Sequence, residues 1–164
     1  MVRRIRSATE LQAGDIRKVD VVKVLESALG AARIASTVAV ERKFEPNCPL
    51  IGADAERLVE VFVNLLDNAG DALGNTGRVT VTCRGTANQG VEVLIEDNAG
   101  GIPEQLHGHV FDPFVTTKED GLGLGLWMVK LYVELINGTI NIRTVTGQGT
   151  RFRIMLPPWG ESQA

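Results

Sequence analysis

Two glycine-rich segments contain the residues of this sequence that are best suited to contact a ligand closely. The first, DNAGGI, covers residues 97–102, and the second, GLGLGL, covers residues 121–126. Both are too rich in glycine for an ordinary helix or strand, and glycine lets the backbone approach another molecule. Roughly twenty residues without obvious structure lie between them, which is typical of a functional or disordered loop. One functional version of such a loop is a flexible cover over a bound molecule.

Asp97, which opens the first segment, ends a predicted strand over residues 90–97. The strand alternates apolar and polar residues, so Asp97 falls on the same face as Val93 and Ile95, opposite Glu92. A carboxylate that faces a core is costly unless hydrogen-bond donors meet it. Either a ligand amino group donates to Asp97, or the backbone N–H groups of the following turn do so.

A narrow polar line runs along the most informative predicted helix, which begins after Asp54 as its N-cap and ends near Leu73. The line consists of Glu60, Asn64, Asp67, Asn68 and Asp71. Asparagine is unfavourable inside a helix, so the two asparagines are expected to serve another purpose. The line contains no cation, which favours a cleft over a solvated outer face. Its oxygen-bearing side chains suit a hard cation such as magnesium that keeps most of its waters.

The remaining predicted elements must position these residues. Strands are predicted over residues 37–44, 78–84, 139–143 and 150–156. Alternation in the last strand turns the Thr150 hydroxyl inward, where it needs a partner. Helices are predicted over residues 20–29 and 123–137, the second with Trp127 and Met128 in the core. Its glycine-rich start leaves backbone N–H groups free, which makes a ready anion site.

Composition and charge narrow the classes of function. The 164 residues are 44% hydrophobic, which fits one compact domain with its own core. The formal net charge of -3 argues against a nucleic-acid partner. No apolar run reaches the roughly 18 residues that span a bilayer, and no signal peptide is recognisable, so a soluble, cytoplasmic chain is expected. Cys48 and Cys83 form no CxxC pair and are interpreted as reduced structural thiols.

Five motifs, taken together, resemble the N, G1, F, G2 and G3 boxes of sensor histidine kinases. They read NLLDNA at residues 64–69, DNAGG at 97–101, FDPF at 111–114, GLGLG at 121–125 and GT at 149–150. Any one box is weak evidence for the family, but five boxes in the family's order and spacing are strong evidence. The resemblance covers residues 18–158 as the catalytic and ATP-binding domain. It leaves residues 1–17 as a linker or the end of a preceding dimerisation helix, and residues 159–164 as a C-terminal tail.

The resemblance implies an α/β fold and a set of site residues. The fold is a two-layer α/β sandwich of the Bergerat or GHKL type, with a mixed, mostly antiparallel sheet packed on helices and a mobile ATP lid. ATP and Mg²⁺ are the implied cofactors, with Asn68 as the metal ligand and Asn64, Asn68 and Lys118 as the catalytic residues. The implied nucleotide-binding residues are Asn68, Asp97, Gly101, Ile102, Phe114, Gly121, Leu122, Gly123, Leu124, Gly125 and Thr150.

The resemblance also implies an activity and its partners. The γ-phosphoryl group of ATP would pass to a histidine in a separate dimerisation and phosphotransfer domain, with a response regulator downstream. The characteristic H box is absent here, because the only histidines, His107 and His109, lie in the predicted lid. The chain is expected to be cytoplasmic, as part of a membrane-bound sensor if the parent protein is anchored.

Two alternatives and two departures qualify the resemblance. A GHKL ATPase or an anti-sigma serine kinase typically carries Glu where Asn64 stands, and a non-catalytic module would bind ATP or only a protein partner. Ala99 replaces the usual glycine of the G1 box, a small change that is expected to be tolerated. Asp71 stands where many members carry Lys or Arg, so the source of that cation stays open.

Overall fold

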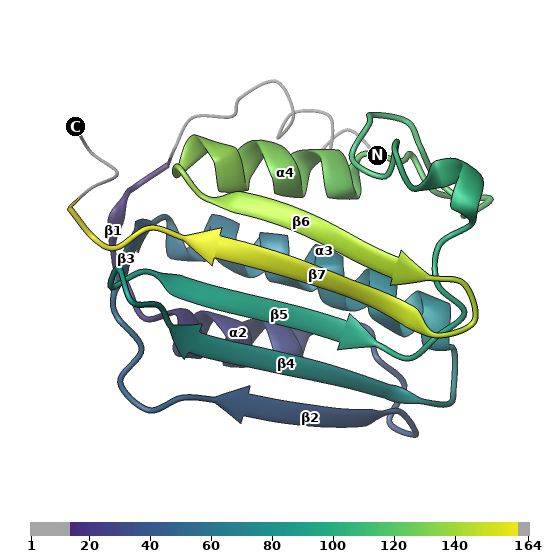
Figure 1. Cartoon of the computed structure of the whole chain (residues 1–164), viewed down its shortest axis with the longest axis horizontal. Helices are drawn as coiled ribbons and strands as arrows, with labels where there is room; N and C mark the ends of the chain where they lie inside the picture. The colour runs from purple at the N-terminus through teal and green to yellow at the C-terminus, as the bar shows by residue number, and fades with distance from the viewer. Residues whose placement is uncertain (1–13, 161–164) are drawn as a thin grey trace.

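Five strands form one mixed sheet in the computed structural model, which describes residues 14–160. Their order across the sheet is β2-β4-β5-β7-β6 (Figure 1). The bounds are Ala39–Phe44 for β2, Arg78–Gly85 for β4, Val91–Asp97 for β5, Thr139–Val145 for β6 and Gly149–Leu156 for β7. Only β2 and β4 pair in parallel, and all other neighbours pair antiparallel. The predicted mixed, mostly antiparallel sheet is confirmed.

Among the described residues, three α-helices cover one face of this sheet (Figure 1). They are α2 at Val21–Ala31, α3 at Ala55–Leu73 and α4 at Gly125–Leu135. The central helix, α3, contacts both other helices as well as β4 and β5, and α4 contacts β6. The predicted two-layer α/β sandwich is therefore confirmed. Within residues 14–160, none of the helices has the length and hydropathy that crossing a bilayer requires.

A second, two-stranded sheet is absent from the sequence-based prediction. It pairs β1, Arg17–Val19, antiparallel with β3, Ile51–Ala53. Each strand has three residues, which is too short for an alternating pattern to be recognised. Ile51 also forms an isolated bridge with Pro158 near the end of the described chain. Most of the predicted linker, residues 1–13, lies outside the described residues.

Asp54 caps α3 and connects it to two other segments. Its Oδ1 accepts hydrogen bonds from the backbone N–H groups of Glu56 at 3.0 Å and Arg57 at 3.3 Å, which confirms the predicted N-cap. Its Oδ2 accepts from the backbone N–H of Asp15 at 3.0 Å. The backbone N–H of Asp54 donates to the Tyr132 hydroxyl of α4 at 2.9 Å. One residue therefore connects the segment before β1, the first turn of α3, and α4.

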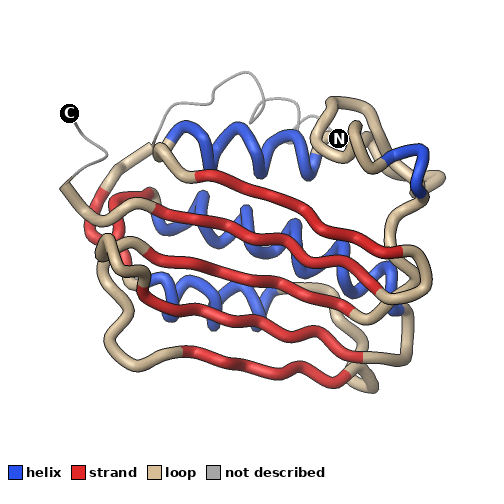
Figure 2. Tube along the Cα trace, viewed as in Figure 1, coloured by secondary structure: helices blue, strands red, loops and turns tan. Residues whose placement is uncertain are grey.

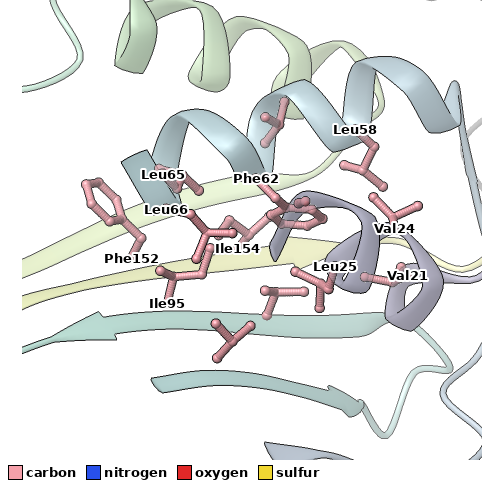
Figure 3. Packing of buried hydrophobic residues seen from close by; sticks show 14 of the residues in the cluster. Val21, Val24, Leu25, Leu58, Phe62, Leu65, Leu66, Ile95, Phe152 and Ile154 are labelled. Carbon is pink, nitrogen blue, oxygen red and sulfur yellow. The ribbon is translucent and has the colours of Figure 1, made fainter. Parts of the chain in front are cut away.

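The core fills the space between the sheet and the helices. Figure 3 shows how side chains from both layers meet there: Val21, Val24, Leu25, Leu58, Phe62, Leu65, Leu66, Ile95, Phe152 and Ile154. The apolar side of α3 is buried as its periodicity predicts, which turns the polar line away from the sheet. Packing against the sheet thus sets the orientation of the asparagines.

The buried face of α4 differs from the prediction. Val129, Tyr132 and Val133 are buried, whereas Trp127 and Met128 are only partly buried. The expectation that Trp127 and Met128 belong to the core is therefore wrong. The sequence of α4 is apolar on almost every side, so periodicity alone cannot select a face. The face is selected by the neighbours of α4, which are α3 and β6.

Cys48 and Cys83 are free thiols whose Sγ atoms lie 3.7 Å apart. Cys83 is fully buried on the same face of β4 as Val79 and Val81, as strand alternation requires. Burial, together with the neighbouring Cys48 thiol, raises the pKa of Cys83 well above its ordinary value. Their proximity is invisible in the sequence, where they stand 35 positions apart.

The outer face of the sheet carries a buried carboxylate. Glu92 on β5 is 3% exposed and lies between Arg84 of β4 and Arg153 of β7. The Arg153 Nε donates to Glu92 Oε1 at 2.6 Å, and the Arg84 Nε donates to Oε2. Burial by itself raises the pKa of Glu92, but the hydrogen bonds and charges of the two arginines outweigh it and lower the pKa. Alternation predicts the face of Glu92 but not its burial.

Candidate functional site

The predicted site residues gather at one end of the molecule. The end of β5, the start of β7, the C-terminal end of α3 and the N-terminal end of α4 all lie there (Figure 1). Figure 2 shows that the segment between β5 and α4 is mostly loop, with one short 3-10 helix at Glu104–Leu106. The loop that was predicted from the two glycine segments is therefore present. It lies at the same end of the molecule as Asp97 and Thr150 and as the polar line of α3.

The first group is centred on Asp97 and Thr150, which pair directly across β5 and β7. Both face the helices, and Thr150 is 7% exposed. The Thr150 hydroxyl lies 3.1 Å from the hydroxyl of Thr144 on β6. Thr144 in turn accepts from the backbone N–H of Ile102 at 2.9 Å. The inward hydroxyl predicted at Thr150 thus has a protein partner. Through Thr144 it is connected to Ile102, at the end of the first glycine-rich segment.

The Asp97 carboxylate is partly buried and is hydrogen-bonded to the backbone. Its Oδ1 accepts from the backbone N–H of Ala99 at 3.0 Å, so the turn supplies a donor, as one of the two predicted alternatives requires. Burial nevertheless raises the pKa of Asp97, although backbone hydrogen bonding from Ala99 and Thr150 acts in the opposite direction. Because these donors do not fully compensate for burial, the ionised carboxylate would gain from a further donor.

Gly101 of the first glycine-rich segment and Gly149 at the start of β7 allow close packing of backbone against backbone. Gly101 has a φ of 77°, and a Cβ there would lie 2.6 Å from the Val145 carbonyl oxygen. Gly149 has a φ of 123°, and its Cβ would lie 1.9 Å from the Asp97 carbonyl oxygen. A Cβ on Gly100 would meet nothing within 4 Å. Gly101 and Gly149 therefore hold the turn after β5 against the β6–β7 hairpin, a role that the sequence does not indicate.

The polar line of α3 divides between two environments. Asp67 accepts from the backbone N–H of Arg33 at 2.7 Å and from its Nη2 at 3.0 Å. The line itself contains no cation, as the sequence shows, and cations reach it from other segments of the chain. Asn64 donates through Nδ2 to the Glu60 carbonyl oxygen at 3.0 Å, which leaves its Oδ1 near the start of α4.

Lys118 places a cation beside the C-terminal part of the polar line. Its Nζ donates to Asn68 Oδ1 at 3.2 Å and forms an ion pair with Asp71. The predicted catalytic residues Asn68 and Lys118 are thus in direct contact, although they stand 50 positions apart in the sequence. Asn68 Oδ1 faces a positively charged group in this structure. A cation from the loop thus lies beside position 71, where the resemblance led us to expect a basic residue.

The loop that carries Lys118 is closed on itself by backbone contacts. The Phe114 N–H donates to the Gly123 carbonyl oxygen at 2.8 Å, and the Gly121 N–H donates to the Lys118 carbonyl oxygen at 3.1 Å. Gly123 has a φ of 68°, and a Cβ there would lie 2.5 Å from the carbonyl carbon of Phe114. Glycine is therefore required where the loop meets its own beginning.

Only one of the two aromatic residues anchors this loop. Phe111 packs edge-on against Phe152 of β7, with ring centroids 6.4 Å apart, and Lys130 lies over its ring. Phe114 is 74% exposed and adopts a positive φ of 68°. Phe114 therefore does not anchor the loop, although it belongs to the same FDPF motif as Phe111. Its exposure leaves the predicted contact with nucleotide as a proposal.

The second glycine segment leads directly into α4. Leu122 and Leu124 are partly buried, and Gly125 is the first residue of the helix. A Cβ on Gly125 would lie 3.2 Å from Asn64 Oδ1, so the start of α4 abuts the polar line of α3. No side chain caps this end of α4, which leaves backbone N–H groups for an anion.

The polar residues near Asn68 suit a magnesium ion that takes only a few of its ligands from the protein. Residues 14–160 contain no group of three His, Cys, Asp or Glu side chains that could hold a metal. His107 Nε2 donates to the Ile102 carbonyl oxygen at 2.8 Å, and His109 Nδ1 lies 2.7 Å from Asp112 Oδ2, so both histidines are engaged. An amide oxygen such as that of Asn68 suits Mg²⁺ that takes its other ligands from water and phosphate.

Comparisons with known proteins identify the family of this chain. The family described as histidine kinase-, DNA gyrase B-, and HSP90-like ATPase matches residues 53–160. Sensor histidine kinase ZraS of Salmonella typhi is 38% identical over 121 residues, which cover 72% of this chain and 26% of ZraS. The chain thus spans about a quarter of the length of that relative.

Two solved structures extend the likeness to the fold. The mycobacterial sensor histidine kinase MprB matches with a TM-score of 0.77 at 29% identity, over 87% of this chain and 97% of the MprB chain. Full-length ShkA in complex with AMPPNP matches with a TM-score of 0.75 at 25% identity, over 87% of this chain and 31% of the ShkA chain. The chain belongs to the family of histidine kinase-, DNA gyrase B- and HSP90-like ATPases, and its fold is that of the sensor histidine kinase catalytic domain.

Proposed function

We propose that this chain binds ATP with Mg²⁺ and donates the γ-phosphoryl group to a histidine of a separate dimerisation domain. The contact between Lys118 and Asn68, beside the uncapped start of α4, carries the proposal. A cation, an amide oxygen and free backbone N–H groups meet there, and together they suit a triphosphate with its metal. Membership of the family and the AMPPNP in the ShkA structure support the same reading.

In the proposed complex, one end of the site binds the adenine base and the other end binds the phosphates. Asp97 accepts from the adenine amino group, and Thr150 supports that contact from the opposite strand. This arrangement favours adenine over guanine, which carries an acceptor oxygen in place of the amino group. Backbone N–H groups of the segment 121–125 and the Lys118 ammonium bind the phosphates, and the Gly121 N–H would first have to leave the Lys118 carbonyl oxygen. Gly101, Ile102 and Phe114 complete the proposed nucleotide contacts.

Phosphoryl transfer needs chiefly positioning and charge neutralisation. Mg²⁺, when bound, supplies charge neutralisation at the phosphate oxygens, and Asn68 is the residue that would hold it. Asn64 holds its amide oxygen beside the start of α4 and orients that end of the site. None of these residues is a nucleophile, so the acceptor belongs to another domain.

The proposal extends to the organisation of the parent protein. Residues 18–158 are the catalytic and ATP-binding domain, residues 1–17 lead from a dimerisation helix or linker, and residues 159–164 form a tail. The partners are the dimerisation and phosphotransfer domain and a response regulator, and the setting is the cytoplasm. A GHKL ATPase or an anti-sigma serine kinase is disfavoured because the amide of Asn64 cannot take a proton as a carboxylate can.

A transfer assay tests the proposal directly. The chain is mixed with its helical dimerisation domain and γ-labelled ATP, and the label is followed by mass spectrometry. We expect the label on a histidine of the helical domain, and none on His107 or His109 when the chain is incubated alone. Label on either of these two histidines, or release of free phosphate without any labelled protein, would contradict the proposal.

A further inference from the structure

We propose that Asp71 is a positioning residue of the nucleotide site. It holds Lys118 against α3 until a phosphate of ATP replaces the Asp71 carboxylate as the partner of Lys118. The inference rests on the proposed function, because ATP is the ligand that competes for Lys118. It assigns a role to the residue at which this chain departs from the basic residue of many family members. Binding of ATP then requires Lys118 to exchange a carboxylate for a phosphate.

The geometry places one ammonium group on two acceptors of the same helix. Asn68 and Asp71 are three positions apart on α3, so their side chains lie on the same face. Lys118 contacts both, and the only ion pair of Asp71 among residues 14–160 is the one with Lys118. The backbone N–H of Lys118 donates to Thr116 Oγ1 at 3.0 Å, which fixes the turn from which the side chain reaches α3.

The same contacts stand in the way of a bound nucleotide. Lys118 uses Asn68 Oδ1, which is the proposed metal ligand, and Asp71 places a negative charge beside the proposed phosphate site. One ammonium group cannot neutralise both Asp71 and a phosphate tail. Removing the Asp71 charge therefore frees Lys118 for the phosphates and removes a repulsion.

The expected size of the effect follows from exposure. The Lys118 and Asp71 side chains are 44% and 43% exposed, so solvent and salt screen their attraction. Exposed ion pairs change equilibria by small factors, and we expect ATP affinity to rise about threefold in Asp71→Asn. A change in ATP affinity of several hundredfold would require a buried ion pair, and the ion pair of Lys118 with Asp71 is not buried.

Asp67 provides a matched control on the same helix. Its carboxylate pairs with Arg33 and does not contact Lys118. Asp67→Asn removes the same charge from α3 and leaves the Lys118 contacts in place. Asp71→Glu keeps the charge at position 71 and is expected to restore wild-type behaviour.

The first measurement needs no nucleotide. Trypsin cleaves after a lysine whose side chain is free to enter the protease, so cleavage after Lys118 reports on its release from α3. We expect cleavage of the nucleotide-free chain to be several-fold faster in Asp71→Asn than in wild type, Asp67→Asn or Asp71→Glu. Equal cleavage rates in all four proteins, with equal thermal stability, would overturn the positioning role.

The second measurement is the affinity for Mg²⁺-ATP by calorimetry. We expect Asp71→Asn to bind about threefold more tightly than wild type, and the gain to shrink when Lys118→Met is also present. Weaker binding in Asp71→Asn would overturn the inference and make Asp71 a metal ligand. If wild type bound no ATP, the proposed function would fail, whereas the trypsin comparison would still decide whether Asp71 holds Lys118.

Discussion

Asp97 on β5 and Thr150 on β7 lie directly opposite each other, and the carboxylate and the hydroxyl face the same side of the sheet. The two residues are joined to their surroundings in different ways. Thr150 is hydrogen-bonded through Thr144 to the turn after β5, whereas Asp97 retains a raised pKa because burial outweighs its backbone donors. The Thr150 hydroxyl therefore already has a hydrogen-bond partner in the protein, whereas the ionised Asp97 carboxylate would be stabilised by a further donor from a ligand.

Asp97 should make nucleotide affinity depend on pH. A donated amino hydrogen favours the ionised carboxylate, so ATP binding lowers the pKa that burial has raised. As pH falls through the raised pKa, Asp97 takes up a proton and ATP affinity should decrease. Calorimetry over a pH series measures this dependence.

Asp97→Asn should bind ATP weakly and lose that part of the pH dependence. The same variant should melt at or above the wild-type temperature near neutral pH, because it removes a partly buried charge. Wild-type affinity with an unchanged pH profile would exclude Asp97 from the nucleotide site.

Asn68→Ala should weaken binding of ATP mainly when Mg²⁺ is present. Loss of an oxygen ligand lowers metal affinity, and we expect roughly a ten- to hundredfold loss of Mg²⁺-ATP affinity. Titration of ATP with and without Mg²⁺ separates the metal contribution from the direct one. Asp67→Asn, which lies one position away and pairs with Arg33, is expected to leave both affinities unchanged.

Gly149→Ala should destabilise the fold far more than Gly147→Ala. Both glycines have a positive φ, of 123° and 79° respectively. A Cβ on Gly149 would meet the Asp97 carbonyl oxygen at 1.9 Å, whereas nothing lies within 4 Å of a Cβ on Gly147. We expect a loss of about 1 kcal/mol at Gly147 from backbone strain and roughly 3 kcal/mol or more at Gly149. Urea denaturation measures both, and equal losses would contradict the close approach.

Glu92→Gln should reduce stability and change its dependence on pH. The folded pKa of Glu92 is lowered, so its ionised form stabilises the protein above the unfolded pKa, and this contribution is lost as pH falls through the folded pKa. Replacing the carboxylate leaves Arg84 and Arg153 without their charged partner, at a cost of about 1–3 kcal/mol near neutral pH.

The difference between Glu92→Gln and wild type should shrink in acid, because both side chains are then neutral. Unfolding by urea at several pH values shows this convergence. A constant difference at every pH would mean that the side chain contributes through packing and not through its charge.

Strand alternation was sufficient to orient the inward residues of the site. It places Asp97 and Thr150 on the helix-facing side, and helical periodicity turns Asn64 and Asn68 away from the core, where both are partly buried. The contact between Lys118 and Asp71 could not be derived in this way, because 47 positions separate them and nothing local links a loop lysine to α3. The proximity of Cys48 and Cys83 was hidden for the same reason.

Periodicity also failed where it was ambiguous or too short. Trp127 and Met128 were assigned to the core because α4 is apolar on most sides, and only its contacts with α3 and β6 select the buried face. The three-residue strands β1 and β3 carry no alternation to recognise. The two phenylalanines of the FDPF motif cannot be told apart by sequence, yet Phe111 packs on Phe152 whereas Phe114 is exposed.

The triple attachment of Asp54 has a mechanical consequence. Its carboxylate holds the backbone of Asp15 and the first turn of α3, and its backbone N–H is bonded to Tyr132 of α4. The segment before β1, the first turn of α3 and the Tyr132 hydroxyl of α4 are therefore joined at a single residue. Because α3 runs without interruption from Ala55 to Leu73, we expect any change in how its first turn is held at Asp54 to shift Asn68 as well.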